Sequence, residues 1–234
     1  MLSIVIPTLN EEKYLPRLLD SIQSQETLLD YEIIVCDGHS IDRTVEIARG
    51  YGCLVIESEK RSPAIQRNLG AKIAQGDVIF FSDADNILPA GFLSKSYAEF
   101  KKNNLSVAGF YLNFRSPRPI FRLFTFFYNF GCWALQWVFP VSVGVGIIVE
   151  REKHKLAGGF DEGIFIGEDY DYTKRLSQVG KYRMISSVRI IYSVRRLEKE
   201  GVITVLWKWI KGAVYFFVKG PIYKEIVKYD FGNF

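Results

Sequence analysis

Short apolar segments alternate with segments of helical periodicity through the first third of the chain. The pattern predicts strands at 2–6, 32–36, 53–56 and 77–81, helices at 42–49 and 64–74, and one helix through Leu15, Leu18, Leu19 and Ile22. Pro7 is expected to end the first strand. Strands that are apolar throughout and alternate with helices predict an α/β fold whose mostly parallel sheet is covered on both faces.

Beyond residue 105 the chain becomes aromatic. Residues 123–149 are 27 positions without a charge, which is long enough to cross a bilayer. A single crossing there would put Asp85 and Asp169, two candidate site residues, on opposite sides of the membrane. We therefore expect 119–139 to form an amphipathic hydrophobic helix in the membrane surface or under a loop. Residues 141–149 are expected to return as a core strand.

The last forty residues are basic and aromatic. From Arg195 to Lys228 there are eight Lys and Arg against three Asp and Glu, with Trp and Phe side chains interleaved. Such a mixture favours an anionic membrane interface. The alternative is a tail that packs on the core or forms a homodimer contact. We expect 1–196 to be one domain and 197–234 an amphipathic helical tail.

Composition narrows the class of protein. The 234 residues are 48% hydrophobic and 24% charged, values typical of a globular chain with a sizeable core. Thirty Lys and Arg against 26 Asp and Glu give a net charge of +4, too mild for a dedicated nucleic-acid binder. Three cysteines without a CxxC pair argue against a zinc site or a disulfide framework. The N-terminus lacks the pattern of a signal peptide, so we expect a reducing, cytoplasmic setting.

The segment Asp83-Ala84-Asp85 directly follows a predicted buried strand. Carboxylates at positions i and i+2 of an extended chain project to one side, where they repel each other unless a cation lies beside them. Oxygen ligands favour Mg²⁺ or Mn²⁺, completed by waters and substrate phosphates. The alternative is a solvated loop in which an aspartate caps the next helix.

Two further charged positions lie near the predicted carboxyl edge of the sheet. Asp37 ends the second strand, where a carboxylate can accept N–H groups from a nucleotide base. Ser40 and Asp42 behind it can cap the following helix. Arg67 lies in a predicted helix and either reaches a diphosphate or forms a salt bridge with a surface acid.

A second carboxylate pair, Glu168-Asp169, begins an amphipathic helix whose apolar positions are Tyr172, Leu176 and Val179. Acidic residues in a first turn are stabilised by the helix dipole, so capping is one interpretation. The other is a general base that activates an alcohol.

Taken together and in this order, the motifs resemble those of family 2 glycosyltransferases. They are Ser3–Glu11 (SIVIPTLNE), Val35–Thr44 (VCDGHSIDRT), Arg67–Gly70 (RNLG), Gly76-Asp77, Asp83–Asp85 (DAD), Gly158–Glu162 (GGFDE) and Glu168-Asp169. The resemblance covers roughly residues 2–196. It implies a GT-A fold, a nucleotide-sugar donor, a divalent metal (Mn²⁺ or Mg²⁺) and inversion at the anomeric carbon.

The resemblance also implies roles for individual residues. The nucleotide-sugar site would be formed by Pro7, Thr8, Asn10, Glu11, Asp37, Arg67, Asn68, Asp83 and Ala84, with Asp37 meeting the base. Asp83 would contact the ribose or the metal, and Asp85 would ligate the metal beneath the diphosphate. Asp169 would be the catalytic base, with Glu168 beside it on the acceptor side. Some relatives have a His or a QxxRW motif after the last core strand; this chain has Arg195-Arg196, either of which would hold diphosphate oxygens.

These roles describe a hexosyltransferase that uses a UDP- or GDP-linked sugar and a lipid-linked or glycan acceptor. It would be peripheral on the cytoplasmic membrane face and would act in polysaccharide or glycolipid biosynthesis. The missing QxxRW motif argues against a processive synthase. One alternative is a sugar-phosphate nucleotidyltransferase, which would need a Gly-rich basic loop where this chain has Pro7-Thr8-Leu9-Asn10. The other is an inactive nucleotide-sugar-binding membrane scaffold, which would have no need of the Asp169 base.

Overall fold

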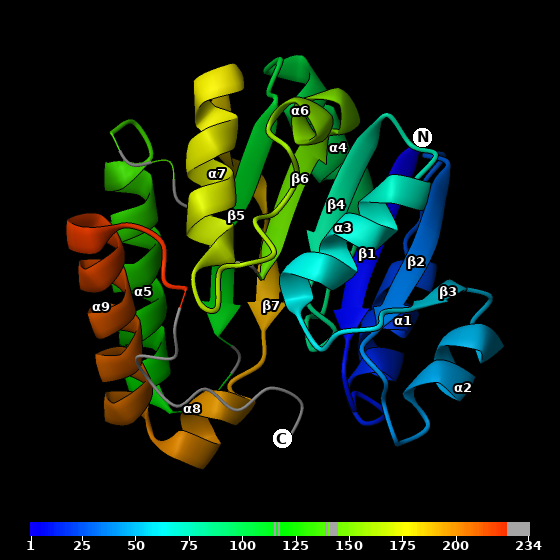
Figure 1. Ribbon diagram of the computed structural model, residues 1–234, viewed down its shortest axis with the longest axis horizontal. Helices are drawn as coiled ribbons and strands as arrows, with labels where there is room; N and C mark the ends of the chain where they lie inside the picture. Colours follow the sequence, from blue (N-terminus) through cyan, green and yellow to red (C-terminus); the bar gives the residue numbers. More distant parts are fainter. Residues whose placement is uncertain (115, 117, 139, 141–144, 224–234) are drawn as a thin grey trace.

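The computed structural model describes residues 1–114, 116, 118–138, 140 and 145–223 (Figure 1). The side chains of residues 196, 202, 203, 206, 209, 210, 213 and 217 are not part of that description. Parts of the predicted strand at 141–149, residue 139 of the predicted aromatic helix and the end of the tail therefore lie outside the described residues.

A seven-stranded sheet forms the centre of the protein, in the order β3-β2-β1-β4-β6-β5-β7. The strands are β1 (Leu2–Thr8), β2 (Tyr31–Asp37), β3 (Leu54–Glu57), β4 (Val78–Ser82), β5 (Val107–Phe114), β6 (Gly146–Glu150) and β7 (Tyr182–Tyr192). Strand β6 runs antiparallel to both of its neighbours, β4 and β5, and the other pairings are parallel. The predicted α/β fold with a mostly parallel sheet is confirmed.

Helices connect the strands and cover the sheet. They are α1 (Leu15–Gln23), α2 (Thr44–Gly50), α3 (Pro63–Ile73), α4 (Phe92–Lys102), α5 (Pro119–Leu135), α6 (Arg151–Leu156), α7 (Glu168–Val179), α8 (Arg195–Glu200) and α9 (Val202–Lys219). Two buried clusters lie on opposite faces of the sheet: one takes side chains from α1 and α4, the other from α3 and α7. Figure 1 shows α3 and α7 in front of the sheet and α4 behind it.

Pro7 does not end the first strand, contrary to the prediction. Strand β1 continues to Thr8, and Pro7 lies opposite Cys36 of β2. On its other side β1 pairs with β4 only as far as Val5. Beyond that point β1 has a neighbour on one side only, and a residue without an N–H group is tolerated there as it is in an edge strand.

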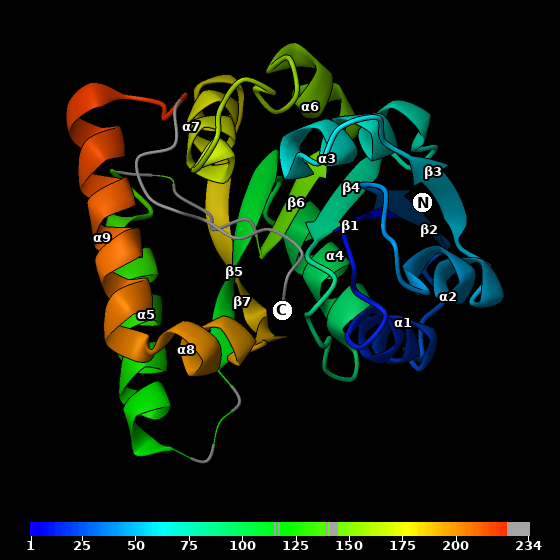
Figure 2. The same ribbon diagram turned by 60° about the horizontal axis from the view of Figure 1, so that its bottom comes forward.

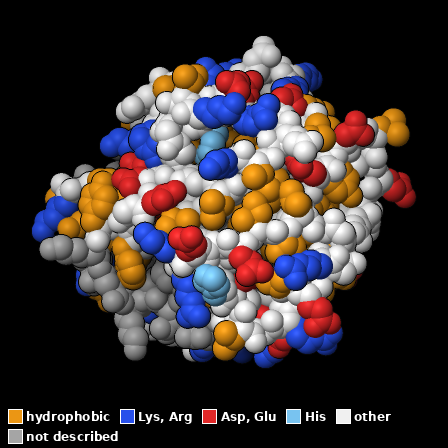
Figure 3. Space-filling model, turned by 45° about the vertical axis from the view of Figure 1, so that its right-hand side comes forward, with side chains coloured by type: hydrophobic (Ala, Val, Ile, Leu, Met, Phe, Trp, Pro, Cys, Tyr) orange, Lys and Arg blue, Asp and Glu red, His pale blue; other side chains and the backbone are white. Residues whose placement is uncertain are grey.

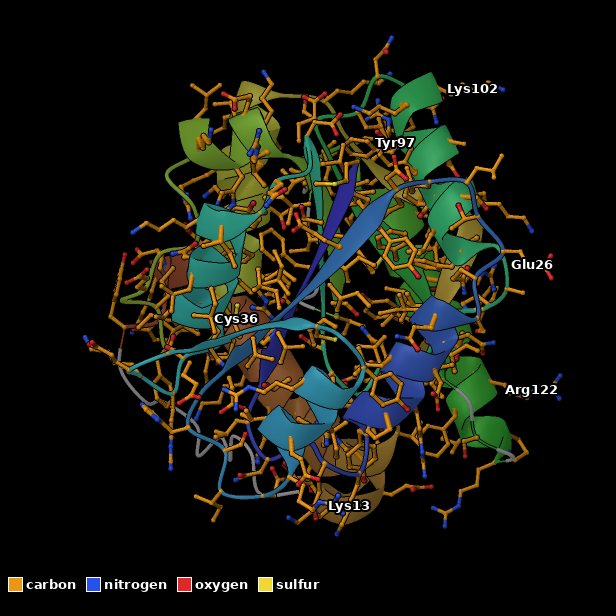
Figure 4. All side chains as sticks on the ribbon, turned by 90° about the vertical axis from the view of Figure 1, so that its right-hand side faces the viewer. Lys13, Glu26, Cys36, Tyr97, Lys102 and Arg122 are labelled. Atoms are coloured by element: carbon orange, nitrogen blue, oxygen red, sulfur yellow. The ribbon has the colours of Figure 1, made fainter. Side chains whose placement is uncertain are left out.

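Helix α3 lies unusually close to the sheet because of Gly70. A Cβ at this position would come within 2.3 Å of Val5 Cγ1 and 2.9 Å of Cys36 Sγ. The absence of a side chain therefore lets α3 settle onto β1 and β2, one turn away from Arg67. Cys36 is buried beneath the helix, as the side view in Figure 4 shows.

Helix α7 is held against the sheet by an aromatic cluster. The Phe160 ring stacks on Tyr172 at 3.8 Å and meets the edge of Phe81 at 5.1 Å. His154 Nδ1 shares a 2.7 Å hydrogen bond with the Tyr172 hydroxyl. Phe160 and Tyr172 are almost fully buried, so the start of α7 has a fixed position over the sheet.

The remaining helices, α5, α8 and α9, lie beyond the strands β5 and β7 at one side of the molecule (Figures 1 and 2). None of the helices in the described ranges has the length and apolar character that crossing a bilayer requires. On the face presented in Figure 3, basic and acidic side chains are interspersed rather than separated by sign.

The buried imidazole of His154 predicts a specific acid sensitivity of folding. Burial lowers the pKa of His154 to about 4 from its usual 6.5, and Arg175 adds to the shift. As the pH falls from 6.5 to 4 the unfolded chain therefore binds a proton that the folded protein does not, and stability is lost over this window. His154→Gln should reduce that loss by up to about 3 kcal/mol.

The measurement is urea unfolding at pH 7 and pH 4.5 for both proteins. His39→Asn, which replaces an exposed imidazole, is the matched control and should keep the wild-type dependence. If the wild type and His154→Gln lost the same stability between pH 7 and pH 4.5, His154 would not be the cause of the acid sensitivity.

Candidate functional site

The candidate site lies at the carboxyl ends of β1, β2 and β4, where the loop before α7 and the segment after β7 approach them. Figure 2 turns this end of the sheet toward the viewer, with α8 at the same end. Ligands of parallel α/β sheets bind at this edge. The motifs that the sequence singled out are separated by up to 158 positions, from Asn10 to Glu168, yet most meet here.

At the ends of β1 and β2, Asp37 is held by neighbouring donors. Its Oδ1 accepts hydrogen bonds from the Thr8 hydroxyl at 2.9 Å and the Ser40 hydroxyl at 2.5 Å, and its Oδ2 accepts the Ser40 N–H at 2.7 Å. Only 1% of Asp37 is exposed. The buried carboxylate thus fixes the loop after β2.

The loop after β1 is bound to the loop after β2. Asn10 adopts a left-handed backbone (φ 56°), donates its N–H to Ser40 Oγ at 2.8 Å and accepts the Ile41 N–H on its Oδ1 at 2.9 Å. The Glu11 N–H reaches Thr44 Oγ1 at 2.7 Å. The polar residues of the first motif therefore fix the two loops to each other at this edge of the sheet.

Arg67 connects the two carboxylate pairs. From α3, its Nη2 contacts Asp83 Oδ1 at 3.0 Å and its Nη1 contacts Glu168 Oε1 at 2.8 Å. Its guanidinium also lies over the Phe160 ring at 5.3 Å, and its side chain is 4% exposed. The salt bridge expected as one alternative exists, but with two acids of the site rather than with a surface acid.

The backbone of the Asp83-Ala84-Asp85 segment is fixed by its neighbours. Asn86 donates to the Val145 carbonyl at 2.5 Å, and the Asp83 N–H approaches the same carbonyl at 3.4 Å. Ala84 is buried, so the two aspartates lie on the opposite side of the chain. Burial raises the pKa of Asp83 to about 6, with Arg67 opposing the shift and Asp85 adding to it.

Arg195, at the start of α8, binds two further acids of the site. It binds Glu11 through two hydrogen bonds, at 2.8 Å to Oε2 and 2.7 Å to Oε1, and its Nε lies 3.0 Å from Asp85 Oδ2. The guanidinium covers the Tyr14 ring at 4.3 Å. Burial raises the pKa of Glu11, and the pairing with Arg195 opposes that shift.

The second carboxylate pair opens α7 after Gly167, whose left-handed backbone (φ 84°) favours glycine. Asp169 is 9% exposed, and its Oδ1 accepts the Tyr170 N–H at 2.9 Å. Asn68, on α3, is hydrogen-bonded to the loop that precedes α7. Its side chain binds both the N–H and the carbonyl of Phe160 and reaches Glu162 Oε1 at 2.9 Å, which anchors the GGFDE loop to α3.

The residues fit a divalent metal that substrate phosphates complete. Among the described residues, no group of three or more His, Cys, Asp or Glu side chains could hold a metal alone. Asp83 and Asp85 nevertheless supply two carboxylates on one side of the chain, the set with which Mg²⁺ and Mn²⁺ bind when phosphate oxygens fill the other positions. Arg67 and Arg195 neutralise these carboxylates in the structure.

Two contributors had no signal in the sequence. Gln66 donates through Nε2 to the carbonyls of Thr8 at 2.7 Å and Cys36 at 2.6 Å and thereby joins the ends of β1 and β2. Tyr14 supplies the ring beneath Arg195. Neither role is visible in the sequence, because the burial of Gln66 and the identity of its partners depend on the packing of α3.

Two relatives illustrate what the chain is similar to. It is 29% identical over 201 residues to the uncharacterized glycosyltransferase YwdF of Bacillus subtilis (strain 168), covering 82% of this chain and 74% of the relative. It is 27% identical over 195 residues to the chondroitin synthase of Pasteurella multocida (strain Pm70), covering 80% of this chain but only 20% of the synthase.

Solved structures share the fold. The structure of S. aureus TarS 1–349 in complex with UDP-GlcNAc superposes with a TM-score of 0.69 at 20% identity, over 82% of this chain and 58% of that one. The mannosyltransferase PcManGT from Pyrobaculum calidifontis, in complex with GDP-Man and Mn²⁺, gives a TM-score of 0.67 at 22% identity, over 90% of this chain and 64% of that one. The sheet with its single reversed strand is therefore the GT-A fold.

The family follows from the sequence match. The model of glycosyl transferase family 2 matches residues 3–162, which is more than half of the chain and includes the ends of β1, β2 and β4 as well as the GGFDE loop. On this match, the chain belongs to glycosyl transferase family 2.

Proposed function

We propose that this protein is an inverting, metal-assisted glycosyltransferase that moves a hexose from a UDP- or GDP-linked donor to a hydroxyl of a lipid-linked or glycan acceptor. Asp169 is the general base in this proposal. The observation that carries it is the double contact of Arg67, which binds Asp83 of one carboxylate pair and Glu168 of the other. One guanidinium thus joins the metal-type motif to the carboxylate pair that contains the candidate base.

The charge of the site supports a donor that arrives with a cation. Five carboxylates (Glu11, Asp83, Asp85, Glu168 and Asp169) meet two guanidinium groups (Arg67 and Arg195), so the described cluster carries five negative and two positive charges when all are ionised. A diphosphate would be repelled by that excess. Asp83 and Asp85 would hold a divalent cation, which would reduce the repulsion and supply Lewis-acid stabilisation of the leaving diphosphate.

The donor's nucleotide would lie along the ends of β1 and β2. Thr8, Asn10 and Asp37 hold the walls of that pocket by the hydrogen bonds described above, and a rigid wall limits the entropy lost when a ligand binds. PcManGT in complex with GDP-Man and Mn²⁺, and TarS in complex with UDP-GlcNAc, support a nucleotide-sugar donor for this fold.

Asp169 would remove the proton of the attacking acceptor. The acceptor oxygen forms a bond to the anomeric carbon, the bond from that carbon to the diphosphate breaks, and the proton passes to the Asp169 carboxylate. Attack from the face opposite the leaving group inverts the configuration. Arg67 would orient Glu168 beside the base, on the acceptor side.

The acceptor and the place of action belong to the same proposal. The aromatic helix α5 and the basic, aromatic helix α9 support a peripheral position on the cytoplasmic membrane face, where a lipid-linked acceptor is available. Nucleic acid is not expected as a partner.

Metal binding should depend on Asp85. Asp85→Asn removes a charged ligand, and since even outer-shell changes typically cost 10–100-fold in metal affinity, we expect Mn²⁺ affinity in the presence of UDP to fall by at least about 100-fold. Isothermal titration calorimetry measures this Mn²⁺ affinity. Asp30→Asn, the same change on an exposed residue at the opposite end of the sheet, should bind as the wild type does. Unchanged Mn²⁺ binding by Asp85→Asn would refute the metal assignment.

Asp169 should be required for transfer but not for donor binding. Asp169→Asn nearly preserves the shape of the side chain but cannot take a proton, so transfer should fall by about 10²–10⁴-fold. Donor affinity with metal should change little, because the lost interaction acts in the transition state. Transfer assays beside donor titration separate an enzyme from a binding protein.

Asp171→Asn is the matched control on the same helix, because Arg175 Nε holds this carboxylate at 2.7 Å. It should transfer normally. Loss of donor binding in Asp169→Asn would make Asp169 a donor ligand or a structural cap, and normal transfer by Asp169→Asn would place the base elsewhere.

A further inference from the structure

Helix α5 turns its polar side chains toward the protein. Asn129 accepts the Leu112 N–H on Oδ1 at 2.9 Å and donates Nδ2 to the Leu112 carbonyl at 2.8 Å, on β5 beyond its pairing with β6. Gln136, which follows the helix, accepts the Met184 N–H of β7 at 3.2 Å. These side chains satisfy backbone groups that would otherwise lack partners.

The opposite side of α5 is apolar and exposed. Leu123, Phe126, Phe130, Trp133 and Trp137 recur at helical spacing and keep between 53% and 65% of their surface in solvent. Phe126 stacks on Phe130 at 6.2 Å, and Phe130 meets Trp133 at 5.8 Å, so the rings form a continuous strip. Soluble proteins rarely expose a contiguous apolar patch of this kind without a partner.

Helix α9 lies alongside α5 in both ribbon views and adds to the strip (Figures 1 and 2). Its residues Trp207, Lys211, Val214 and Val218 follow the helical repeat, and all are exposed. Both helices, which lie side by side, therefore expose large apolar side chains.

The charges on these two helices are all positive. Between residues 119 and 138 Arg122 is the one charged residue, and α9 carries Lys208, Lys211 and Lys219 and no acid. Lys208 forms an ion pair with Glu200. Arg122, Lys211 and Lys219 are exposed, and Arg122 points away from the body of the protein in Figure 4. Apolar and aromatic side chains with cations and without acids are the composition of a surface for anionic lipid.

We propose that the outward faces of α5 and α9, here called the α5–α9 face, dock on a bilayer rich in anionic phospholipid. The aromatic strip enters the headgroup boundary, and Arg122, Lys211 and Lys219 meet the lipid phosphates. The polar residues of α5 stay against β5 and β7, so docking does not require the helix to turn or the fold to open. This deepens the proposed function and rests on it only for the biological purpose, which is access to a lipid-linked acceptor.

Hydrogen bonds and an ion pair connect the helices that follow β7 to the candidate site. Arg195 ties α8 to Glu11 and Asp85, and beyond α9 the Ile222 carbonyl accepts the Phe165 N–H at 2.7 Å in the loop that precedes Glu168. A protein seated on the α5–α9 face thus holds its site at a fixed orientation to the membrane surface.

Vesicle co-sedimentation tests the proposal without donor, metal or acceptor. The full chain should bind vesicles of phosphatidylglycerol and phosphatidylcholine but only weakly vesicles of phosphatidylcholine alone. Phe126→Ser/Phe130→Ser should reduce the partition coefficient by at least about tenfold, since each ring loses buried apolar area. Arg122→Gln/Lys211→Gln should reduce it by about tenfold or more on the anionic vesicles, and added salt should have the same effect.

Matched controls change the same residue types elsewhere. Leu28→Ser/Ile41→Ser removes two apolar side chains that are 104% and 88% exposed, and Lys72→Gln/Lys102→Gln removes two exposed cations. Both should bind vesicles as the wild type does. Because the altered side chains on α5 are more than half exposed, all variants should keep the wild-type melting temperature.

Equal vesicle binding by the α5 variants and the controls would overturn the proposal. So would a wild type that forms dimers broken by Phe126→Ser/Phe130→Ser and does not bind vesicles, because the face would then be a contact between copies of the chain. Vesicle binding without any transferase activity would leave this inference standing while refuting the proposed function, and transfer to a soluble acceptor without vesicle binding would do the reverse.

Discussion

The contact between Arg67 and two acids distant in sequence is the interaction on which the site depends. Asp83 ends a strand and Glu168 begins a helix, and like charges so close would drive the two elements apart. The buried guanidinium reverses the sign of that interaction and fixes their distance. Removing one member of a buried ion network typically costs about 3–5 kcal/mol, so the arrangement is a structural requirement as well as a chemical one. Gly70 makes it geometrically possible, because it brings α3 down onto β1.

Arg195 also binds two acids that are distant in the sequence, on the other side of the site. It binds Glu11 and Asp85, and its segment comes from the far end of the chain. The family match ends at residue 162, so this arginine lies outside the matched region and connects the C-terminal helices to the sheet. The two arginines leave the described cluster with more carboxylates than guanidinium groups.

Helix α5 shows how polarity can be arranged against the usual rule. In most surface helices the apolar face packs on the core and the polar face meets water. Here Asn129 and Gln136 meet the backbone of β5 and β7, and aromatic side chains lie on both sides of the helix. Phe121 is buried and Phe124 packs on Phe114, whereas Phe126 and Phe130 are exposed. Hydrogen bonds and apolar contacts together orient the helix. The exposed side of the helix is therefore available for association. Its aromatic and basic residues are the composition that the proposed contact with anionic lipid requires.

The amino-acid sequence by itself determined the α/β class with a mostly parallel sheet, the alternation of strands and helices in the first third of the chain and the identity of the two carboxylate pairs. Hydrophobic period and strand-end polarity are local properties, which is why they could be recognised. It also indicated the family through motifs in order. The tertiary structure alone decided that Arg67 bridges the pairs, that Asn68 anchors a loop and that β1 runs through Pro7. It alone decided which side of α5 faces outward. Each of these depends on contacts between segments far apart in the chain, where the partner and the direction of a side chain are set by packing, and no local pattern encodes that packing.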